Sequence, residues 1–169
     1  LEVARKCPGV RHFHQVSTDE VYGQALRGAF SEDDPIEARS PYSASKAGAD
    51  MIVTAYAASY GLSATISRGS NNIGPYQYLE KAVPLFVTAA IDGEPLPVYG
   101  DGLYVRDYQY VLDHCRGIDM VMRAGVSGEI YNLGGGNQVA AIDLARAIVR
   151  KLGRPASLVT LVPDRVGQD

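Results

Sequence analysis

The sequence contains few cysteines and no apolar stretch long enough to cross a membrane. Only two cysteines occur, Cys7 and Cys115, and they lie far apart without a CxxC or Cys/His metal-binding spacing. A disulfide framework is therefore not expected, and a reducing, cytoplasmic location is favoured. The longest apolar stretch, residues 82–91, is too short for a membrane span. The chain starts with neither a signal peptide nor a methionine, so we expect it to be a piece of a longer protein.

An excess of positive charge is also lacking. The net charge is −3 and the isoelectric point is about 5.6, so nucleic acid and anionic membranes are not expected as partners. With 46% hydrophobic and 21% charged residues, the composition is that of an ordinary soluble globular protein, which excludes a disordered tail and a fibrous repeat. A chain of 169 residues can form one compact domain, with little room for a second.

Segments typical of strands and helices alternate along the chain. Ser40-Pro41 suits the start of a helix, and Gly61 can end that helix in the left-handed conformation. The alternation predicts an α/β fold with a largely parallel sheet flanked by helices. Polar clusters at 17–20 and 69–72 follow strand ends, where ligands gather in such sheets, so we expect one shared site. The pattern predicts strands at 10–16, 62–68, 96–99, 106–111 and 129–133, and helices at 40–59, 80–92, 113–124 and 141–152.

Tyr42 and Lys46 are the sharpest candidates for chemistry. Residues four apart lie on one helix face, so the phenol and the ammonium can address the same point. A tyrosine base working near neutral pH needs its pKa lowered by roughly three units, and a neighbouring cation supplies roughly one to three. Lys46 would supply part of this shift, and a second cation such as an oxidised nicotinamide ring would complete it. The spacing alone also occurs on ordinary solvated helix faces, but Thr18, 24 residues earlier, adds the hydroxyl of a Ser/Thr–Tyr–Lys triad.

Blocks throughout the chain resemble the signatures of the dTDP-glucose 4,6-dehydratases, which belong to the extended short-chain dehydrogenase/reductase superfamily. The blocks are Ser17–Gly23, Ser40–Lys46, Ser70–Gln77, Pro95–Gly102, Arg106-Asp107, Tyr131–Gly136 and Asp164–Asp169. The resemblance implies that residues 1–75 form the second half of a Rossmann-like NAD-binding domain. Residues 76–169 would mainly form a small α/β lobe for the sugar nucleotide, with a strand and helix at 104–124 returning to the Rossmann core. It further implies NAD as cofactor, dTDP-glucose as substrate and a homodimer paired through the Tyr42 helix.

The resemblance also assigns catalytic roles. Tyr42 would take the proton of the sugar C4 hydroxyl while hydride passes to NAD, Thr18 would hold the C4 oxygen, and Lys46 would bind the nicotinamide ribose. Glu20 would then remove the C5 proton, and Asp19 would protonate the departing C6 hydroxyl. Two carboxyl groups with separated pKa values suit this division of work. Because adjacent strand residues point to opposite faces, the backbone must turn near Thr18 for both acids to face inward.

Binding residues follow from the same resemblance. Ser17, Tyr42, Lys46 and Asn72 would contact the cofactor. Pro97 and Tyr99 would form the pocket for the nucleotide base, while Arg106, Arg165 and Asn132 would hold the diphosphate. The substrate-binding set as a whole is Thr18, Asn71, Lys81, Pro97, Tyr99, Arg106, Asn132 and Arg165. The sequence departs from the family pattern at Gln168, where histidine is usual, at Leu112, where an acid is common, and at Leu79, where proline is usual; the first departure concerns the diphosphate end of the pocket.

A glycine-rich dinucleotide-binding fingerprint is missing from the sequence. Gly134–Gly136 does not provide one, because Val139 occupies the third glycine position, and we interpret it as a strand-to-helix turn. We therefore expect the isolated chain to bind NAD poorly and to turn over little or nothing. His12 and His14 lack a third ligand, so no metal site is expected. Two alternatives stay open: a nucleotide-sugar epimerase or decarboxylase on the same scaffold, and a non-catalytic sugar-nucleotide-binding fragment.

Overall fold

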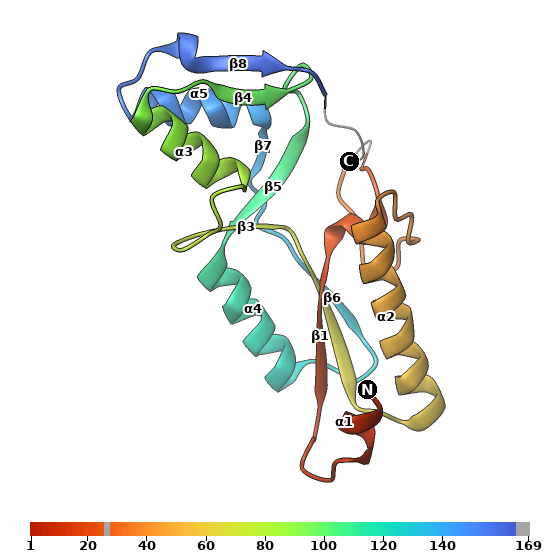
Figure 1. Cartoon of the computed structure of the whole chain (residues 1–169). Coiled ribbons are helices and arrows are strands. Elements are labelled where there is room, and N and C mark those ends of the chain that lie inside the picture. The colour runs from red at the N-terminus through yellow and green to blue at the C-terminus, as the bar shows by residue number, and fades with distance from the viewer. Residues whose placement is uncertain (26–27, 165–169) are drawn as a thin grey trace. The chain divides into compact units, whose positions relative to one another are not determined.

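The computed structural model describes residues 1–25 and 28–164, which fall into two compact units (Figure 1). Unit 1 comprises Leu1–Ser70 and Leu112–Gly134. Unit 2 comprises Asn71–Val111 and the described residues from Gly135 onward. The chain therefore passes from one unit to the other at residues 70/71, 111/112 and 134/135.

Unit 1 is built on a three-stranded parallel sheet. Its strands are β1 (Phe13–Thr18), β2 (Ala64–Gly69) and β6 (Ile130–Leu133), in the order β1-β2-β6. The register places Ser17 opposite Arg68, and Arg68 opposite Asn132. The helical elements are α1 (Glu2–Lys6), the 3₁₀ turn η1 (Asp19–Tyr22), α2 (Pro41–Tyr60) and α4 (Val111–Ala124). Because all three strands are parallel, their carboxyl ends meet at one edge of the sheet, and η1 begins at that edge.

Helix α2 begins and ends where the sequence predicts. The Ser40 side chain accepts a hydrogen bond from the Ser43 amide, and the Ser43 side chain accepts one from the Ser40 amide, which forms a capping box. Pro41 occupies the first turn, where its missing N–H removes no helical hydrogen bond. Gly61 ends the helix with φ 65°, in the left-handed region that glycine adopts without a Cβ clash. These caps fix the position of Tyr42 and Lys46 along the helix.

The two faces of the unit 1 sheet carry different side chains. Val53 of α2 packs against Ala64 and Ile66 of β2, which point to one face. Alternate residues of β2 point to the opposite face, where the His114 ring of α4 lies over Gly69. Figure 1 shows α2 and α4 on either side of β1, β2 and β6. The sheet is thus covered by a helix on each face, as is usual for parallel sheets.

Unit 2 contains two small sheets and two helices. Strand β5 (Val105–Tyr110) pairs in parallel with β3 (Asn71–Ile73) and antiparallel with β7 (Gln138–Ala140). Strands β4 (Leu96–Tyr99) and β8 (Val159–Val162) form a parallel pair. Helices α3 (Ala82–Asp92) and α5 (Ala141–Lys151) and the short turn η2 (Ala156–Leu158) complete the unit. Its core joins α3, β4 and α5 through Phe86, Ala90, Leu96, Val98, Ala145 and Val149.

The predicted α/β architecture with largely parallel pairing is confirmed, with differences in detail. The first strand is shifted from 10–16 to Phe13–Thr18, because its pairing with β2 starts at Phe13 and continues through the polar Ser17 and Thr18. Strands β3, β7 and β8 were not predicted; β3 and β7 have three residues each, which is too few for a periodic signal. The interpretation of Gly134–Gly136 as a strand-to-helix turn is wrong, because β7 intervenes before α5.

The compact units divide the chain differently from the predicted domains. The strand and helix at 104–124 were placed together in the Rossmann core, whereas the units separate β5 from α4 near Leu112. The assignment of one part to NAD and the other to the sugar nucleotide stays a prediction. Within the described residues, no helix has the length and apolar character needed to cross a membrane.

A substitution at Gly135 tests the close approach between β5 and the loop before β7. A Cβ at Gly135 would lie 2.3 Å from the Tyr108 carbonyl oxygen and 2.9 Å from Gln109 Cβ, and the backbone oxygen cannot rotate away. We expect Gly135→Ala to lower the free energy of unfolding by about 1–3 kcal/mol in urea titrations. Gly48→Ala in α2 is the control, because nothing lies within 4 Å of its added Cβ, and it should stabilise by about 0.5–1 kcal/mol. Equal stability of the Gly135 variant and the parent would contradict the close contact.

Candidate active site

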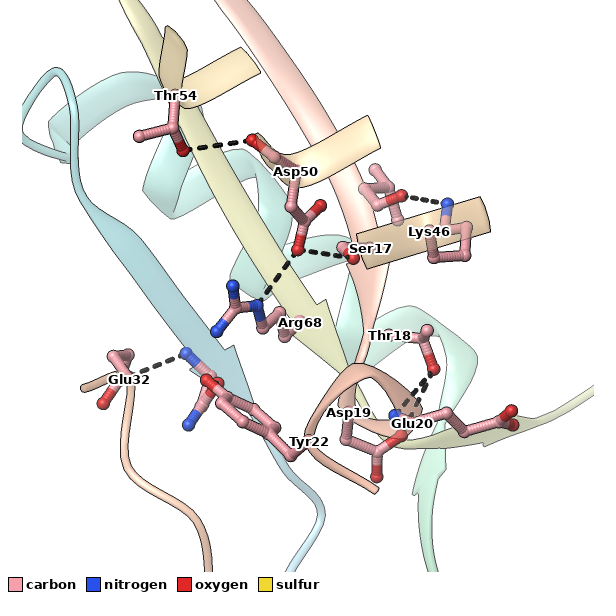
Figure 2. A network of polar contacts seen from close by, with 12 residues as sticks. Ser17, Thr18, Asp19, Glu20, Tyr22, Glu32, Lys46, Asp50, Thr54 and Arg68 are labelled. Atoms are coloured by element: carbon pink, nitrogen blue, oxygen red, sulfur yellow. Dashed lines mark hydrogen bonds and ion pairs between the residues drawn. The ribbon is translucent and has the colours of Figure 1, made fainter. Parts of the chain in front are cut away.

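The end of β1 turns at once into η1, which presents two acidic side chains. Thr18, the last residue of the strand, is the N-cap of η1, and its hydroxyl accepts a 3.3 Å hydrogen bond from the Glu20 amide. The same hydroxyl donates to Asp19 Oδ1 at 3.3 Å. Because the backbone is helical from Asp19 onward, the strand alternation stops and the two acids no longer point to opposite faces. The predicted turn near residue 18 is therefore confirmed (Figure 2).

Tyr42 and Lys46 lie one turn apart on α2. The Lys46 Nζ donates a 2.6 Å hydrogen bond to the Val16 carbonyl oxygen, so the ammonium is held against the carboxyl end of β1. The Tyr42 phenol interacts with the Thr18 hydroxyl and with the charges of Glu20 and Asp19. The five residues predicted to be catalytic, Thr18, Asp19, Glu20, Tyr42 and Lys46, thus come from β1, η1 and α2 of unit 1.

The electrostatic surroundings of Tyr42 differ from the expectation. Partial burial, followed by the nearby carboxylates of Glu20 and Asp19, raises the pKa of the Tyr42 phenol above its ordinary value of 10.0. The hydrogen bond with Thr18 opposes this by lowering the pKa. Lys46 is not among the groups that shift this pKa, and its ammonium donates a hydrogen bond to the Val16 carbonyl oxygen. In this structure Tyr42 is therefore protonated at neutral pH, and a further positive charge near the ring is required to make it a base.

Two substitutions should move the pKa of Tyr42 in opposite directions. Glu20→Gln removes a negative charge that disfavours the phenolate, so the pKa should fall toward 10.0. Thr18→Val removes the hydrogen bond that favours the phenolate, so the pKa should rise further. A ¹³C-labelled tyrosine titration followed by NMR measures both shifts. Glu37→Gln is the control, because its exposed carboxylate does not contribute to the shift, and a shift of either test variant in the opposite direction would refute the assignment.

A buried polar network beside the site was not anticipated from the sequence. Asp50 Oδ2 accepts hydrogen bonds from Ser17 Oγ at 2.9 Å and from Arg68 Nε at 3.1 Å. The Arg68 guanidinium carbon lies 4.7 Å from the centroid of the Tyr22 ring, and the Tyr22 hydroxyl donates to Asn132 Oδ1 at 2.8 Å. The Asp50 and Arg68 side chains are only 2% and 3% exposed. An aspartate one turn after Lys46, on the α2 face that carries Ser43 and Ala47, was the available signal.

Asn132, predicted to bind the diphosphate, already makes contacts within unit 1. Its Oδ1 accepts from Tyr22, and its Nδ2 donates to the Phe30 carbonyl oxygen at 3.2 Å. Its backbone amide donates to Glu32 Oε1 at 2.7 Å. An amide side chain carries two N–H donors, so a ligand could still be bound through the second. Ser17, predicted to contact the cofactor, is buried and donates its hydroxyl to Asp50.

The remaining predicted binding residues lie in unit 2, apart from Arg165, which lies outside the described residues. Asn71 and Asn72 begin β3, Lys81 is the N-cap residue of α3, and the Lys81 side chain is 62% exposed. Pro97 and Tyr99 are on β4, and Arg106 is on β5. Arg165 and the unusual Gln168 lie outside the described residues. The binding role of each of these residues stays a prediction.

His14 of β1 and His12, just before that strand, are hydrogen-bonded to hydroxyl side chains of β2 and of the residue before β2. His12 pairs with Ser63 and Thr65, each at 2.8 Å. His14 pairs with Thr65 at 2.9 Å and Ser67 at 3.0 Å. Burial, together with the charges of neighbouring histidines, lowers the pKa of His14. Across the described part of the chain, no group of three metal-ligating side chains lies together.

Comparisons with known proteins place the chain in a family. The family model described as GDP-mannose 4,6 dehydratase matches residues 1–160, and the chain belongs to this family. It is 45% identical over 160 residues to a dTDP-glucose 4,6-dehydratase of Actinoplanes sp., covering 95% of this chain and 50% of that protein. The crystal structure of a dTDP-glucose 4,6-dehydratase from Streptomyces venezuelae, solved with NAD bound, superposes with a TM-score of 0.92 at 48% identity. That match covers 95% of this chain and 50% of the crystallised one.

Epimerases of the same superfamily share the fold at lower identity. A UDP-glucuronic acid 4-epimerase from Bacillus cereus gives a TM-score of 0.88 at 26% identity, over 98% of this chain and 52% of that one. The fold is thus the Rossmann-like α/β fold of these dehydratases and epimerases. This chain spans about half the length of the relatives it matches.

Proposed function

We propose that the whole protein containing this chain is an NAD-dependent hydro-lyase that converts dTDP-glucose into dTDP-4-keto-6-deoxyglucose. The observation that carries the proposal is the turn η1, which brings Asp19 and Glu20 within electrostatic reach of the Tyr42 phenol. A 4,6-dehydration needs a base for the C4 hydroxyl and a separate acid–base pair for C5 and C6. Unit 1 contains candidates for all three roles, and the dehydratase relatives are nearly twice as similar in sequence as the epimerase (48% against 26% identity).

Oxidation at C4 is the first requirement. Tyr42, once deprotonated, takes the proton from the C4 hydroxyl, and the Thr18 hydroxyl holds the same oxygen by a hydrogen bond. Thr18 already interacts with Tyr42, so both groups can address one substrate atom. The raised pKa of Tyr42 means that Lys46 alone does not create the phenolate, and the positive charge of an oxidised nicotinamide ring supplies the additional stabilisation.

Elimination of water across C5 and C6 is the second requirement. The C4 ketone acidifies the C5 hydrogen, Glu20 removes this proton, and Asp19 donates a proton to the C6 hydroxyl as the C6–O bond breaks. The products of this step are water and a C5–C6 double bond conjugated to the ketone. Return of hydride to C6 and of a proton to C5 then gives the 4-keto-6-deoxy sugar. The two carboxyl groups therefore have opposite tasks, one as a base and the other as an acid.

The residues of unit 1 fit part of a nicotinamide cofactor site. The Lys46 ammonium carries three N–H donors, of which one binds the Val16 carbonyl, so two can bind ribose hydroxyls. Tyr42 lies one turn before Lys46 on the same helix and can share a ribose hydroxyl with it. When bound, NAD accepts hydride from C4 and returns it to C6. Asn72 is a further proposed cofactor contact from unit 2.

The side chains of unit 2 supply a proposed binding surface for the nucleotide. Tyr99 is 37% exposed, so its ring can stack on a base, and Pro97 precedes it by two residues on β4. Arg106 is proposed to bind the diphosphate, as are Arg165 and Asn132 of unit 1, because guanidinium and amide N–H groups donate hydrogen bonds to phosphate oxygens. Asn71 and Lys81 would contact the sugar.

The test uses the whole protein supplied with NAD and a panel of dTDP-glucose, UDP-glucose, UDP-glucuronic acid and GDP-mannose. Dehydration of dTDP-glucose, detected by the alkali-induced absorbance of the keto product, is the expected result, and Tyr42→Phe should abolish it. Discrimination between thymine and uracil should be modest, because a single methyl group is worth only about 1–3 kcal/mol, whereas UDP-glucose also carries a ribose 2′-hydroxyl that dTDP-glucose lacks. Interconversion of C4 epimers, or loss of carbon dioxide from a uronic acid, without a 4-keto-6-deoxy product would establish the alternative class. Tight sugar-nucleotide binding with no turnover would establish a non-catalytic protein.

The proposal also includes a cytoplasmic homodimer. Helix α2 exposes large apolar side chains along its outer face, with Met51 65% and Ile52 54% exposed. Such exposed apolar residues on one helix favour pairing with the same helix of a second copy. Sedimentation of the whole protein should therefore show a dimer, and a Met51→Glu, Ile52→Lys variant should sediment as a monomer.

A further inference from the structure

The turn that carries Thr18, Asp19 and Glu20 is anchored on both sides by buried polar contacts. On its amino-terminal side, the Ser17 hydroxyl donates to Asp50 Oδ2 of α2 at 2.9 Å. On its carboxyl-terminal side, the Tyr22 hydroxyl donates to Asn132 of β6 at 2.8 Å. Ser17 is 6% and Tyr22 is 2% exposed, so water does not compete for either hydrogen bond. The three residues proposed to act on the sugar therefore lie between two fixed points.

Arg68 connects the two anchors. It stands in the middle strand, directly opposite Ser17 on β1 and Asn132 on β6. Its Nε donates to the same Asp50 oxygen that accepts from Ser17. Its guanidinium group lies 4.7 Å from the centroid of the Tyr22 ring. One side chain thus contacts both the helix that carries Tyr42 and the residue that ends η1, as Figure 2 shows.

The hydrogen bonds of Asp50 with Ser17 and Arg68 connect η1 to α2 through the helix face that also carries Tyr42 and Lys46. Asp50 follows Lys46 by four residues and Tyr42 by eight, so all three lie near one face of α2. The Lys46 ammonium donates a hydrogen bond to the carbonyl oxygen of Val16, the residue before Ser17. The hydrogen bonds Lys46–Val16 and Ser17–Asp50 therefore fix the end of β1 against α2. The distance between η1 and the Tyr42 side chain depends on these two bonds.

We propose that Asp50, Arg68, Ser17 and Tyr22 are positioning residues that set the placement of Asp19 and Glu20 relative to Tyr42. They do not touch the substrate, and they act by fixing both ends of η1 against α2 and the sheet. The expected effect on the rate of dehydration rests on the proposed function. Small displacements of acid–base groups are costly, since a misplacement of about 1 Å can reduce a rate by about 10²-fold.

Ser17→Ala and Tyr22→Phe test the proposal with the least disturbance to the fold. Each removes one hydroxyl, and Tyr22→Phe keeps the aromatic ring beside Arg68. We expect each to reduce kcat for dehydration by about 10- to 100-fold while KM for the sugar nucleotide changes less than about 2-fold. Thr88→Val and Tyr131→Phe are matched controls, because their hydroxyls form hydrogen bonds with the Pro84 carbonyl and the Val126 amide, outside the anchors of the turn. These controls should retain the parent kcat.

A double substitution separates positioning from a general loss of structure. If Ser17 acts through Glu20, adding Ser17→Ala to Glu20→Gln should cause little further loss, because the group it positions is already inactive. If the two losses multiply in the double variant, Ser17 acts independently of Glu20 and the proposal is overturned. Retention of the parent kcat in both Ser17→Ala and Tyr22→Phe would also overturn it.

A titration of Tyr42 by ¹³C NMR tests the same geometry without any turnover. Since Glu20 and Asp19 help to raise the pKa of Tyr42, releasing either anchor should let the carboxylates move away and bring that pKa closer to 10.0. The two control variants should leave it unchanged. This readout distinguishes the two proposals: absence of dehydration in the parent refutes the proposed function, whereas an unchanged Tyr42 titration in both anchor variants refutes the positioning role.

Discussion

Replacing Glu20 with glutamine is expected to slow formation of the 4-keto-6-deoxy product by about 10²- to 10⁴-fold. The substitution keeps the size of the side chain, and it leaves intact the backbone amide that bonds to Thr18. It removes only the carboxylate proposed to take the C5 proton. The rate is measured in the whole protein by the alkali-induced absorbance of the product, together with deuterium uptake at C5 from heavy water. Both signals should fall together, because both depend on removal of the C5 proton.

Asp19 and Glu20 can be told apart by changing the leaving group at C6. A substrate with fluorine in place of the C6 hydroxyl releases fluoride, which departs without a proton. Asp19→Asn should therefore lose much less activity on this substrate than on dTDP-glucose, whereas Glu20→Gln should lose as much on both. Glu37→Gln is the control for loss of an exposed carboxylate in the neighbouring loop and should leave the rate unchanged. The reverse pattern would exchange the roles of the two acids, and full activity of Glu20→Gln would exclude it as the base.

Replacing Arg68 with methionine is expected to lower the free energy of unfolding by about 3–5 kcal/mol. The substitution leaves the buried Asp50 carboxylate with the Ser17 hydroxyl as its remaining side-chain donor among the residues that the structure describes, and it removes the cationic group beside the Tyr22 ring. A buried charge without its counter-charge retains its full desolvation cost. Urea unfolding of the whole protein, followed by the circular dichroism of its helices, measures the change.

Arg123→Met is a closely matched control for this experiment. Arg123 also pairs with an aspartate through Nε, at 2.8 Å from Asp119, but the two side chains are 77% and 58% exposed. Its loss should cost less than about 1 kcal/mol, because exposed ion pairs are weak. The double variant Asp50→Leu, Arg68→Met should recover most of the lost stability, since it leaves no unpaired charge. A double variant as unstable as Arg68→Met would show that the loss comes from packing rather than from the charge of Asp50.

Local chemistry made the secondary structure around the candidate site predictable. Helix α2 has both of its ends specified by residues with well-understood capping behaviour, Ser40-Pro41 and Gly61, and it was predicted to within one residue. The turn at Thr18 was also predictable, because two adjacent acids cannot both face one site from an extended strand. In both cases the information lies within a few residues of the feature.

Features that depend on distant residues were not predictable in this way. Nothing near Arg68 in the sequence indicates that its partner is Asp50, 18 residues earlier, or that Tyr22 packs against it. The raised pKa of Tyr42 likewise arises from η1, which is brought to α2 only by the fold. The hydrogen bond from Lys46 to the Val16 carbonyl oxygen, 30 residues earlier, is another such contact.

The interleaving of the two units has a consequence for the order in which the protein can fold during synthesis. The sheet of unit 1 is complete only when β6 pairs with β2, and the whole of Asn71–Val111 is made between these strands. Until residues 130–133 have left the ribosome, Ile66 and Arg68 have no β6 neighbour, and Tyr22 lacks its Asn132 acceptor. Closing so long a loop carries an entropic cost and slows folding. A nascent chain arrested before β6 should therefore be digested readily by protease, and one arrested well after it should be protected.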